Sequence, residues 1–181
     1  MPEHIRAHSL MVTRIALVIA GRLKDAGTTL SIPLVRAGAL MHDIGKTPAL
    51  KRGLDHSEVG RQICLEHHFD EVADIVGEHV RLKDYRLDGE FSEKEIVYYS
   101  DKRVNHDKIV SLEERQAYIL DRYGKNHQAL RERIQENFRL CKKVESKLFS
   151  RLNFGPEAIP LLALQVRIGP EADVNPVADY M

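Results

Sequence analysis

Apolar residues recur at helical spacing along most of this chain, and this repeat constrains the fold more than any other feature. Residues 3–25 carry a stripe of His8, Val12, Ile15, Ile19 and Leu23 at steps of three and four. No segment shows a convincing alternation of apolar and polar residues of the kind that marks a half-buried strand. We therefore expect an all-α helical bundle in which His8 faces inward.

Helix start signals divide the next part of the chain. Ser31 can cap a helix that ends near Gly45 and carries His42 and Asp43 in its last turn, and residues 44–54 then form a loop. Asp55 resembles an N-cap for a helix over residues 56–67, which places His56 at its start. A further helix begins at residue 70 and turns His79 toward its apolar face.

Two capping boxes, at residues 92–95 and 111–114, predict the later helices. The first begins a helix that carries Asp101 among apolar neighbours, and the second begins a helix that stops at Gly124. A long helix then runs to about Ser150. Its predicted buried stripe consists of Leu130, Ile134, Phe138, Cys141 and Leu148.

The length of 181 residues suits one compact domain, which we assign to residues 1–150. Residues 151–181 form a proline-rich C-terminal tail whose apolar run, 159–166, can dock one short helix.

Composition limits the partners of the chain. Lys plus Arg and Asp plus Glu each number 27, so no net field favours nucleic acid or a membrane surface. Tryptophan is absent, and the scattered tyrosines and phenylalanines argue against an aromatic platform for stacking bases. No stretch approaches a membrane span, and Cys64 and Cys141 suit buried, reduced positions. We expect a cytoplasmic protein that acts on a small molecule and that can form a homo-oligomer.

The dipeptide His42-Asp43 is the strongest chemical signal in the chain. Adjacent helical residues point about 100° apart and cannot complete a coordination sphere alone, so the dipeptide needs partners from other helices. Imidazole and carboxylate ligands without cysteine suit iron, manganese or zinc and argue against a closed structural zinc site. The candidate partners are His8, His56, His79 and Asp101.

The order of these residues resembles that of the HD-domain metal-dependent phosphohydrolases. His8, His42-Asp43 and Asp101 follow the family order over about residues 3–110, and residues 40–46 (Leu-Met-His-Asp-Ile-Gly-Lys) are close to its HDIG form. His56, followed by Gly60, and His79 are similar to the additional ligands of the subgroup that binds two metals. That subgroup includes the symmetrical diadenosine tetraphosphate hydrolases of bacteria and the HD-GYP cyclic dinucleotide phosphodiesterases.

The resemblance implies a division of the ligands between two ions. His8, His42, Asp43 and Asp101 would hold one metal, and Asp43 would bridge to a second metal held by His56 and His79. Such a pair of divalent ions supports hydrolysis of a phosphoester or phosphoanhydride bond by a metal-activated water. In this interpretation Asp43 and Lys46 are catalytic, and Lys46, Arg81 and Arg103 contact the phosphates of the substrate.

Departures from the subgroups leave the substrate open. No Gly-Tyr-Pro follows His79, which disfavours cyclic di-GMP, and Val80 stands where the diadenosine tetraphosphate hydrolases commonly carry threonine. A nucleotide or related small phosphorylated molecule is the expected substrate class. Two alternatives stay open: a non-catalytic regulatory module that binds metal or nucleotide, and an oxygenase with a diiron centre. His106 and His127 have no identifiable partner, and His67 and His68 suit helix capping.

Overall fold

The computed structural model describes residues 1–125 and 127–168. These residues form an all-α bundle, as the periodicity predicts, to which one very short hairpin is added. The elements, in chain order, are α1 (Glu3–Asp25), α2 (Ile32–Met41), α3 (Lys46–Leu50), α4 (His56–Glu66), α5 (Asp70–Glu78), α6 (Glu93–Asp101), β1 (Val104–Asn105), β2 (Lys108–Ile109), α7 (Leu112–Tyr123), α8 (Gln128–Phe149), the 3₁₀ turn η1 (Pro156–Ala158) and α9 (Ile159–Gln165).

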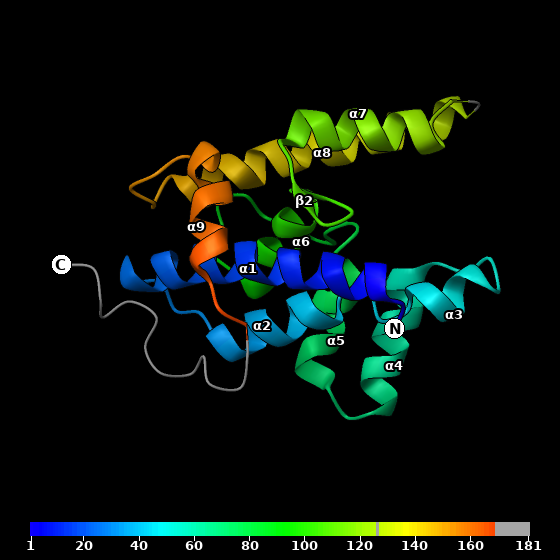
Figure 1. Ribbon diagram of the computed structural model, residues 1–181, viewed down its shortest axis with the longest axis horizontal. Helices are drawn as coiled ribbons and strands as arrows, with labels where there is room; N and C mark the ends of the chain where they lie inside the picture. The colour runs from blue at the N-terminus through cyan, green and yellow to red at the C-terminus, as the bar shows by residue number, and fades with distance from the viewer. Residues whose placement is uncertain (126, 169–181) are drawn as a thin grey trace.

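Helix α1 runs through the middle of the molecule (Figure 1). Its apolar stripe is buried along its whole length, from Val12 through Ile15 and Ile19 to Leu23. Helices α2, α6 and α9 pack directly against it. Because His8 continues the same stripe one turn toward the N-terminus, this packing also buries His8 in the bundle.

The chain leaves α2 earlier than the sequence indicates. Ser31 caps α2 as expected by accepting a hydrogen bond from the Leu34 backbone N–H. The helix ends at Met41, so His42 and Asp43 lie in a tight turn that joins α2 to α3, not in a last helical turn. Helix α3 occupies part of the segment 44–54 that we expected to be a loop.

Gly45 allows this turn to touch α4. A Cβ atom at residue 45 would lie 2.2 Å from the His56 carbonyl oxygen and 2.4 Å from the Gly60 backbone nitrogen. Both are backbone atoms that cannot rotate away, so a side chain at this position requires α4 to shift. The close approach holds the first residue of α4 beside the His42-Asp43 turn.

Helices α4 and α5 form a hairpin with a small apolar core of their own. Asp55 caps α4 through the Ser57 backbone N–H. Cys64, Val72, Ala73 and Val76 are buried between the two helices. The hairpin directs the start of α4 and the end of α5, where His56 and His79 lie, toward the same place (Figure 1).

A two-residue hairpin follows α6 and was not predicted. Val104 and Asn105 pair antiparallel with Ile109 and Lys108. Strands this short contain too few residues to show an alternating pattern, so they leave no strand signal in the sequence. His106, in the turn between them, has a positive φ of 55°.

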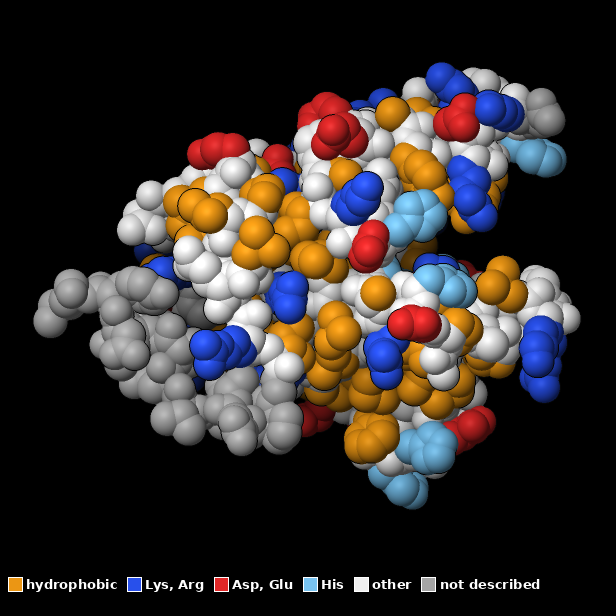
Figure 2. Space-filling view, viewed as in Figure 1, with side chains coloured by type: hydrophobic (Ala, Val, Ile, Leu, Met, Phe, Trp, Pro, Cys, Tyr) orange, Lys and Arg blue, Asp and Glu red, His pale blue; other side chains and the backbone are white. Residues whose placement is uncertain are grey.

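Helices α7 and α8 lie side by side on one flank of the bundle (Figure 1). Phe138, Cys141 and Leu148 of the predicted α8 stripe are buried, but Ile134 is only half-buried and Leu130 is 39 % exposed. The N-terminal half of α8 therefore extends past the core. Figure 2 shows the surface hollowed between the projecting part of α7 and α8 and the part of the bundle below it.

The end of the described chain packs back onto the bundle. Ile159 and Ala163 of α9 are fully buried, and α9 contacts α1. Residues 169–181 of the predicted tail lie outside the described residues. Within the part of the chain that is described, no helix combines the length and apolarity needed to cross a membrane.

Candidate metal centre

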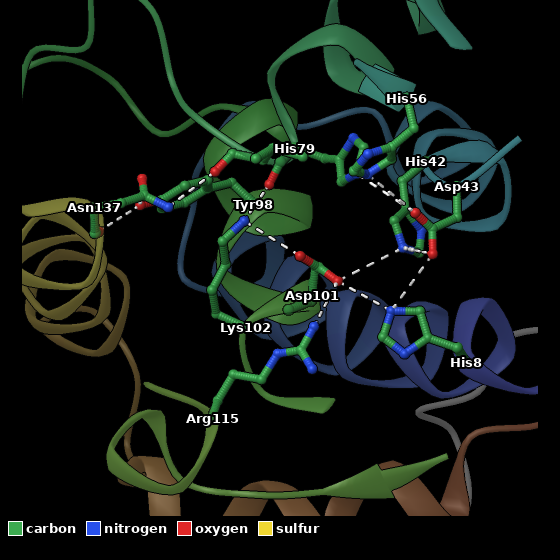
Figure 3. A network of polar contacts seen from close by, with 12 residues as sticks. His8, His42, Asp43, His56, His79, Tyr98, Asp101, Lys102, Arg115 and Asn137 are labelled. Carbon is green, nitrogen blue, oxygen red and sulfur yellow. Dashed lines mark hydrogen bonds and ion pairs between the residues drawn. The ribbon is translucent and has the colours of Figure 1, made fainter. Parts of the chain in front are cut away.

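The six residues singled out as metal ligands lie together, although they come from five separate segments (Figure 3). His8 comes from α1, and His42 and Asp43 come from the turn after α2. His56 is the first residue of α4, His79 follows the last residue of α5, and Asp101 is the last residue of α6. Four of the five segments thus contribute a helix end or an adjoining turn, where side chains can reach the centre without interrupting a helix.

Asp43 stands between two groups of histidines and directs one carboxylate oxygen toward each. Its Oδ2 atom lies 3.6 Å from Nε2 of His42 and 4.0 Å from Nε2 of His8. Its Oδ1 atom lies 3.5 Å from Nε2 of His56 and 3.7 Å from Nε2 of His79. Both groups have the proximity that a bound cation requires, with all candidate ligand atoms within 4.8 Å of one another. One bridging carboxylate can therefore serve two ions.

Asp101 adds a second carboxylate to the group that contains His8 and His42. Its Oδ1 atom is 3.0 Å from His8 Nε2 and 3.7 Å from His42 Nε2. Its Oδ2 atom faces away and accepts a hydrogen bond of 3.2 Å from the ammonium group of Lys102. Only Oδ1 is thus directed toward the histidines, as Figure 3 shows.

Backbone carbonyls fix the orientation of three of the imidazole rings. The Nδ1 atoms of His8, His42 and His79 donate to the carbonyl oxygens of His106, Ala39 and Val76, at 2.8, 2.8 and 2.6 Å. A neutral imidazole with its proton on Nδ1 has a free lone pair on Nε2. The Nε2 atoms of all three rings point into the centre. Such outer hydrogen bonds are the usual support of histidine metal ligands.

The centre has the properties of a site built around cations. Nε2 of His42 is buried and has no hydrogen-bond partner among the described residues. The Nε2 atoms of His56 and His79 face each other at 3.2 Å. A buried nitrogen lone pair without a donor is costly, and a divalent cation would satisfy it. The donor set of imidazole and carboxylate, with both cysteines located elsewhere, fits a divalent transition metal.

Burial keeps two of these histidines in the form that binds metal. Removal from water lowers the pKa of His42 to about 4. The same desolvation, together with the neighbouring His79, lowers the pKa of His56. Both rings are therefore neutral at physiological pH, and only a neutral imidazole has a lone pair to donate.

The two carboxylates stay ionised despite their burial. Desolvation alone would raise the pKa of Asp43, but the neighbouring His79 and His42 side chains and the Lys46 ammonium group hold it well below its usual range. Desolvation likewise opposes ionisation of Asp101, and the Lys102 ammonium group and the neighbouring His8 side chain lower its pKa. The centre therefore presents two negative charges to any cation that enters.

Lys46 lies at the solvent-exposed edge of the centre. Its ammonium group is 2.7 Å from Oδ2 of Asp43, and its side chain is 39 % exposed. His56, at 31 % side-chain exposure, lies on the same open side. These two side chains are therefore the part of the centre that is open to solvent.

The two arginines proposed to bind substrate lie outside the cluster. Arg103 is buried, and its guanidinium donates to Tyr99, Glu145 and the carbonyl oxygens of Val110 and Pro156. These bonds occupy its donors in a structural clamp, so the prediction that Arg103 binds substrate is wrong: every nitrogen of its guanidinium already donates within the fold. Arg81 is exposed and lines a groove of about 800 Å³ between α8 and the ends of α4 and α5.

Three further residues support the centre and were missed from the sequence. Lys102 bonds to Asp101 and to the His79 carbonyl oxygen, and thereby connects the two halves of the site. Arg115 of α7 places its guanidinium 4.0 Å from Asp101 Oδ1. His106, for which we identified no partner, supplies the carbonyl oxygen that orients His8. Lys102 could have been suspected because it directly follows Asp101, whereas a carbonyl oxygen leaves no mark in the sequence.

Comparison with known proteins agrees with this geometry. An uncharacterized protein of Methanocaldococcus jannaschii is 31 % identical over 150 residues, which cover 75 % of this chain and 86 % of that protein. A tRNA (cytidine(56)-2′-O)-methyltransferase of Picrophilus torridus is 31 % identical over 105 residues, which cover 50 % of this chain but only 28 % of the enzyme. No solved structure matches at a significant level. The family model for the HD domain matches residues 5–126, and the chain therefore belongs to the HD-domain family, whose members are generally metal-dependent phosphohydrolases.

Proposed function

We propose that this protein is a metal-dependent phosphohydrolase that cleaves a phosphoester or phosphoanhydride bond in a nucleotide or a related small phosphorylated molecule. One observation carries the proposal: the two carboxylate oxygens of Asp43 face two separate groups of histidines. His8, His42, Asp43 and Asp101 would hold one ion, and Asp43, His56 and His79 would hold the second. Iron, manganese and zinc all suit these ligands.

A pair of divalent ions in such a site lowers the pKa of a shared water to near neutrality and neutralises charge on a phosphate. The protein supplies the geometry for that chemistry. The backbone hydrogen bonds to Nδ1 of His8, His42 and His79 keep the imidazole lone pairs aimed at the centre. This preorganisation avoids rearranging the ligands during the reaction.

Lys46 has a position suited to binding the scissile phosphate. In the structure its ammonium group pairs with Asp43 at the exposed edge. If Asp43 held a metal ion, the Lys46 ammonium group would no longer be needed to balance this carboxylate and would be free to contact an incoming phosphate. Its flexible stem and three donors suit this contact. Arg81 remains a proposed contact for a more distant phosphate of the substrate.

Elemental analysis followed by hydrolysis assays tests the proposal. The purified chain, reloaded anaerobically with iron, manganese or zinc, should bind about two ions and hydrolyse at least one member of a panel of nucleotides and generic phosphoesters. Asp43→Asn should lose both ions and all hydrolysis, because both groups depend on this side chain. Asp74→Asn provides a control, since Asp74 is an exposed carboxylate on α5 that pairs with Arg61.

The same experiment separates this function from its alternatives. Two bound ions without hydrolysis of any panel member would reject the phosphohydrolase and favour a regulatory module. Oxygen consumption by the iron-loaded protein, with a matching change in its optical spectrum, would favour the diiron oxygenase. One bound ion that persists in His79→Gln would remove His56 and His79 from the proposed centre.

A further inference from the structure

A strip of cationic and aromatic side chains leads away from the metal centre along α7. We define this α7 strip as Arg115, Tyr118 and Arg122, with His106 of the β1–β2 turn beside it. The three helix residues are spaced by three and four, so they share one face of α7. They span about 10 Å along the helix axis, which is enough for one nucleotide.

The strip begins at the metal centre. A terminal nitrogen of the Arg115 guanidinium lies 4.0 Å from Asp101 Oδ1, the oxygen that faces His8 and His42. The other terminal nitrogen donates to the Asn105 side chain at 2.8 Å, which holds the guanidinium in place. Figure 3 shows Arg115 directed toward Asp101 from the side opposite His79. Arg115 and Lys46 thus place positive charge beside both carboxylates of the centre.

The strip continues through an aromatic pair. The rings of Tyr118 and His106 meet edge to face, with centroids 5.5 Å apart, and the Tyr118 hydroxyl lies 3.2 Å from His106 Nε2. Arg115 approaches the Tyr118 ring at 5.8 Å from its centroid. Tyr118 is half-buried and His106 is exposed. These contacts orient the rings while leaving aromatic surface open to solvent.

Arg122 ends the strip with a second, exposed cation. Its guanidinium donates to the hydroxyls of Tyr118, at 3.3 Å, and Tyr123, at 3.2 Å. The order from the metal centre outward is therefore cation, aromatic pair, cation. Alternation of cations with aromatic rings suits a chain of phosphates and bases, because guanidinium groups bind phosphate and ring faces stack on bases.

We infer that the α7 strip binds a nucleotidyl phosphate, with the phosphate in contact with both Arg115 and the metal centre and the base stacked on Tyr118. This inference rests on the proposed function and narrows its substrate class to compounds that carry a base. The scattered aromatic residues of the sequence argue against a platform for stacking bases. Folding nevertheless brings His106 and Tyr118 together from different elements. Arg122 then faces the next phosphate of the ligand, whether in a free nucleotide or in a short RNA.

The test compares ligands with and without a base. Affinities of the four nucleoside 5′-monophosphates and of ribose 5-phosphate are measured on the full, metal-loaded chain, as KM where the compound is hydrolysed and as a calorimetric Kd where it is not. The best nucleotide should bind about tenfold more tightly than ribose 5-phosphate, the usual order of effect for one stacked base. Equal affinity, or no measurable binding of either compound, would overturn the inference.

Variants locate the effect on the strip. Tyr118→Leu should abolish the preference for the base, whereas Tyr118→Phe, which keeps the ring, should retain it. Phe69→Leu is the matched control, because Phe69 is an exposed aromatic residue at the start of α5. Arg115→Gln should weaken nucleotide and ribose 5-phosphate by the same factor. A preference for the base that survives Tyr118→Leu would show that the base binds elsewhere.

A further experiment distinguishes a short RNA from a free nucleotide as the ligand. A 5′-phosphorylated RNA of four nucleotides is compared with the best mononucleotide. Tighter binding of the RNA that is lost in Arg122→Gln identifies an RNA end, and equal binding identifies a free nucleotide. Both results support the strip. Hydrolysis of base-free phosphoesters with no preference for a base would reject the strip alone, whereas a base preference without hydrolysis would reject only the phosphohydrolase.

Discussion

Lys102 shows how a single residue can prepare a site for a cation. Its ammonium group is buried, bonds to Asp101 and the His79 carbonyl oxygen, and lies 4.2 Å from the centroid of the Tyr98 ring. It compensates the charge of Asp101 on the side away from the proposed ions. A buried carboxylate that loses its partner is expensive, typically by about 3–5 kcal/mol.

We therefore expect Lys102→Met to destabilise the metal-free protein by about 3 kcal/mol and the metal-loaded protein by less, because a bound ion also neutralises Asp101. Urea unfolding of both forms measures the difference. Lys108→Met, which removes an exposed lysine from β2, serves as the control. Equal destabilisation with and without metal would show that Lys102 does not act through the charge of Asp101.

His42 should make the stability of the metal-free protein depend on pH. Burial lowers its pKa from 6.5 to about 4, so between these values the unfolded chain binds a proton that the folded chain does not. Stability must then fall as the pH drops from about 6.5 to 4, by up to about 3 kcal/mol. The depressed carboxylate pKa values of Asp43 and Asp101 extend the loss below pH 4.

Unfolding free energies of the metal-free protein between pH 4 and 7.5 check this prediction. In His42→Gln, which cannot titrate, the slope across this window should be smaller. An unchanged slope would assign the pH dependence to other groups.

At the scale of elements, the sequence predicted most helices but not the turn at the centre. The stripe of α1 and the capping boxes of α6 and α7 are local signals, and they identified these elements and the inward face of His8. The end of α2 at Met41 is followed by a turn in which Gly45 contacts α4, and such a contact between segments distant in sequence leaves no local signal. Leu130 and Ile134 have the spacing of a core stripe, yet the core ends before it reaches them. Periodicity shows which face is apolar but not what covers it.

The candidate site, too, could be predicted from the sequence only in part. All six proposed ligands could be selected because they are side chains of distinctive chemistry on predicted helices. The role of His106 could not, because it acts on His8 through its backbone oxygen. Arg103 was misassigned because its position after Asp101 gave no information about the carbonyl groups and the glutamate that surround it.

The contact between the His42-Asp43 turn and α4 gives a prediction at this scale. Gly45→Ala introduces a Cβ that would lie 2.2 Å from the His56 carbonyl oxygen, so α4 must move and carry His56 with it. We expect a loss of about 1–3 kcal/mol in stability, as for other overpacked sites. Metal stoichiometry should fall from about two to about one.

Equilibrium unfolding and elemental analysis measure both effects. Gly21→Ala is the control, since a Cβ at Gly21 on α1 meets nothing within 4 Å. Retention of two ions by Gly45→Ala would show that the position of His56 tolerates the shift.

For the whole molecule, bound metal should be a major contribution to stability. The proposed ligands join α1, α4, the turns after α2 and α5, and the end of α6, so each ion would cross-link segments distant in sequence. Ions at 100 times their Kd stabilise a native state by about 2.7 kcal/mol per site, which corresponds to about 5–10 °C in the Tm of a chain this size.

Thermal unfolding before and after chelation measures this shift, and re-addition of metal should restore the original Tm. Asp43→Asn should unfold at a Tm that is insensitive to chelation. A chelation shift of the same size in Asp43→Asn would place the stabilising ion elsewhere.

The Arg103 clamp connects the metal centre to the far end of the chain. Arg103 stands two residues after Asp101 and donates to the carbonyl oxygen of Pro156, just before α9. Thermodynamic coupling is reciprocal, so if undocking of residues 156–165 disturbs Asp101, bound metal must equally hold that segment down. Amide protons of α9 should then exchange more slowly in the metal-loaded protein, which would make the docking of this helix a readout of ion occupancy at the distant metal centre.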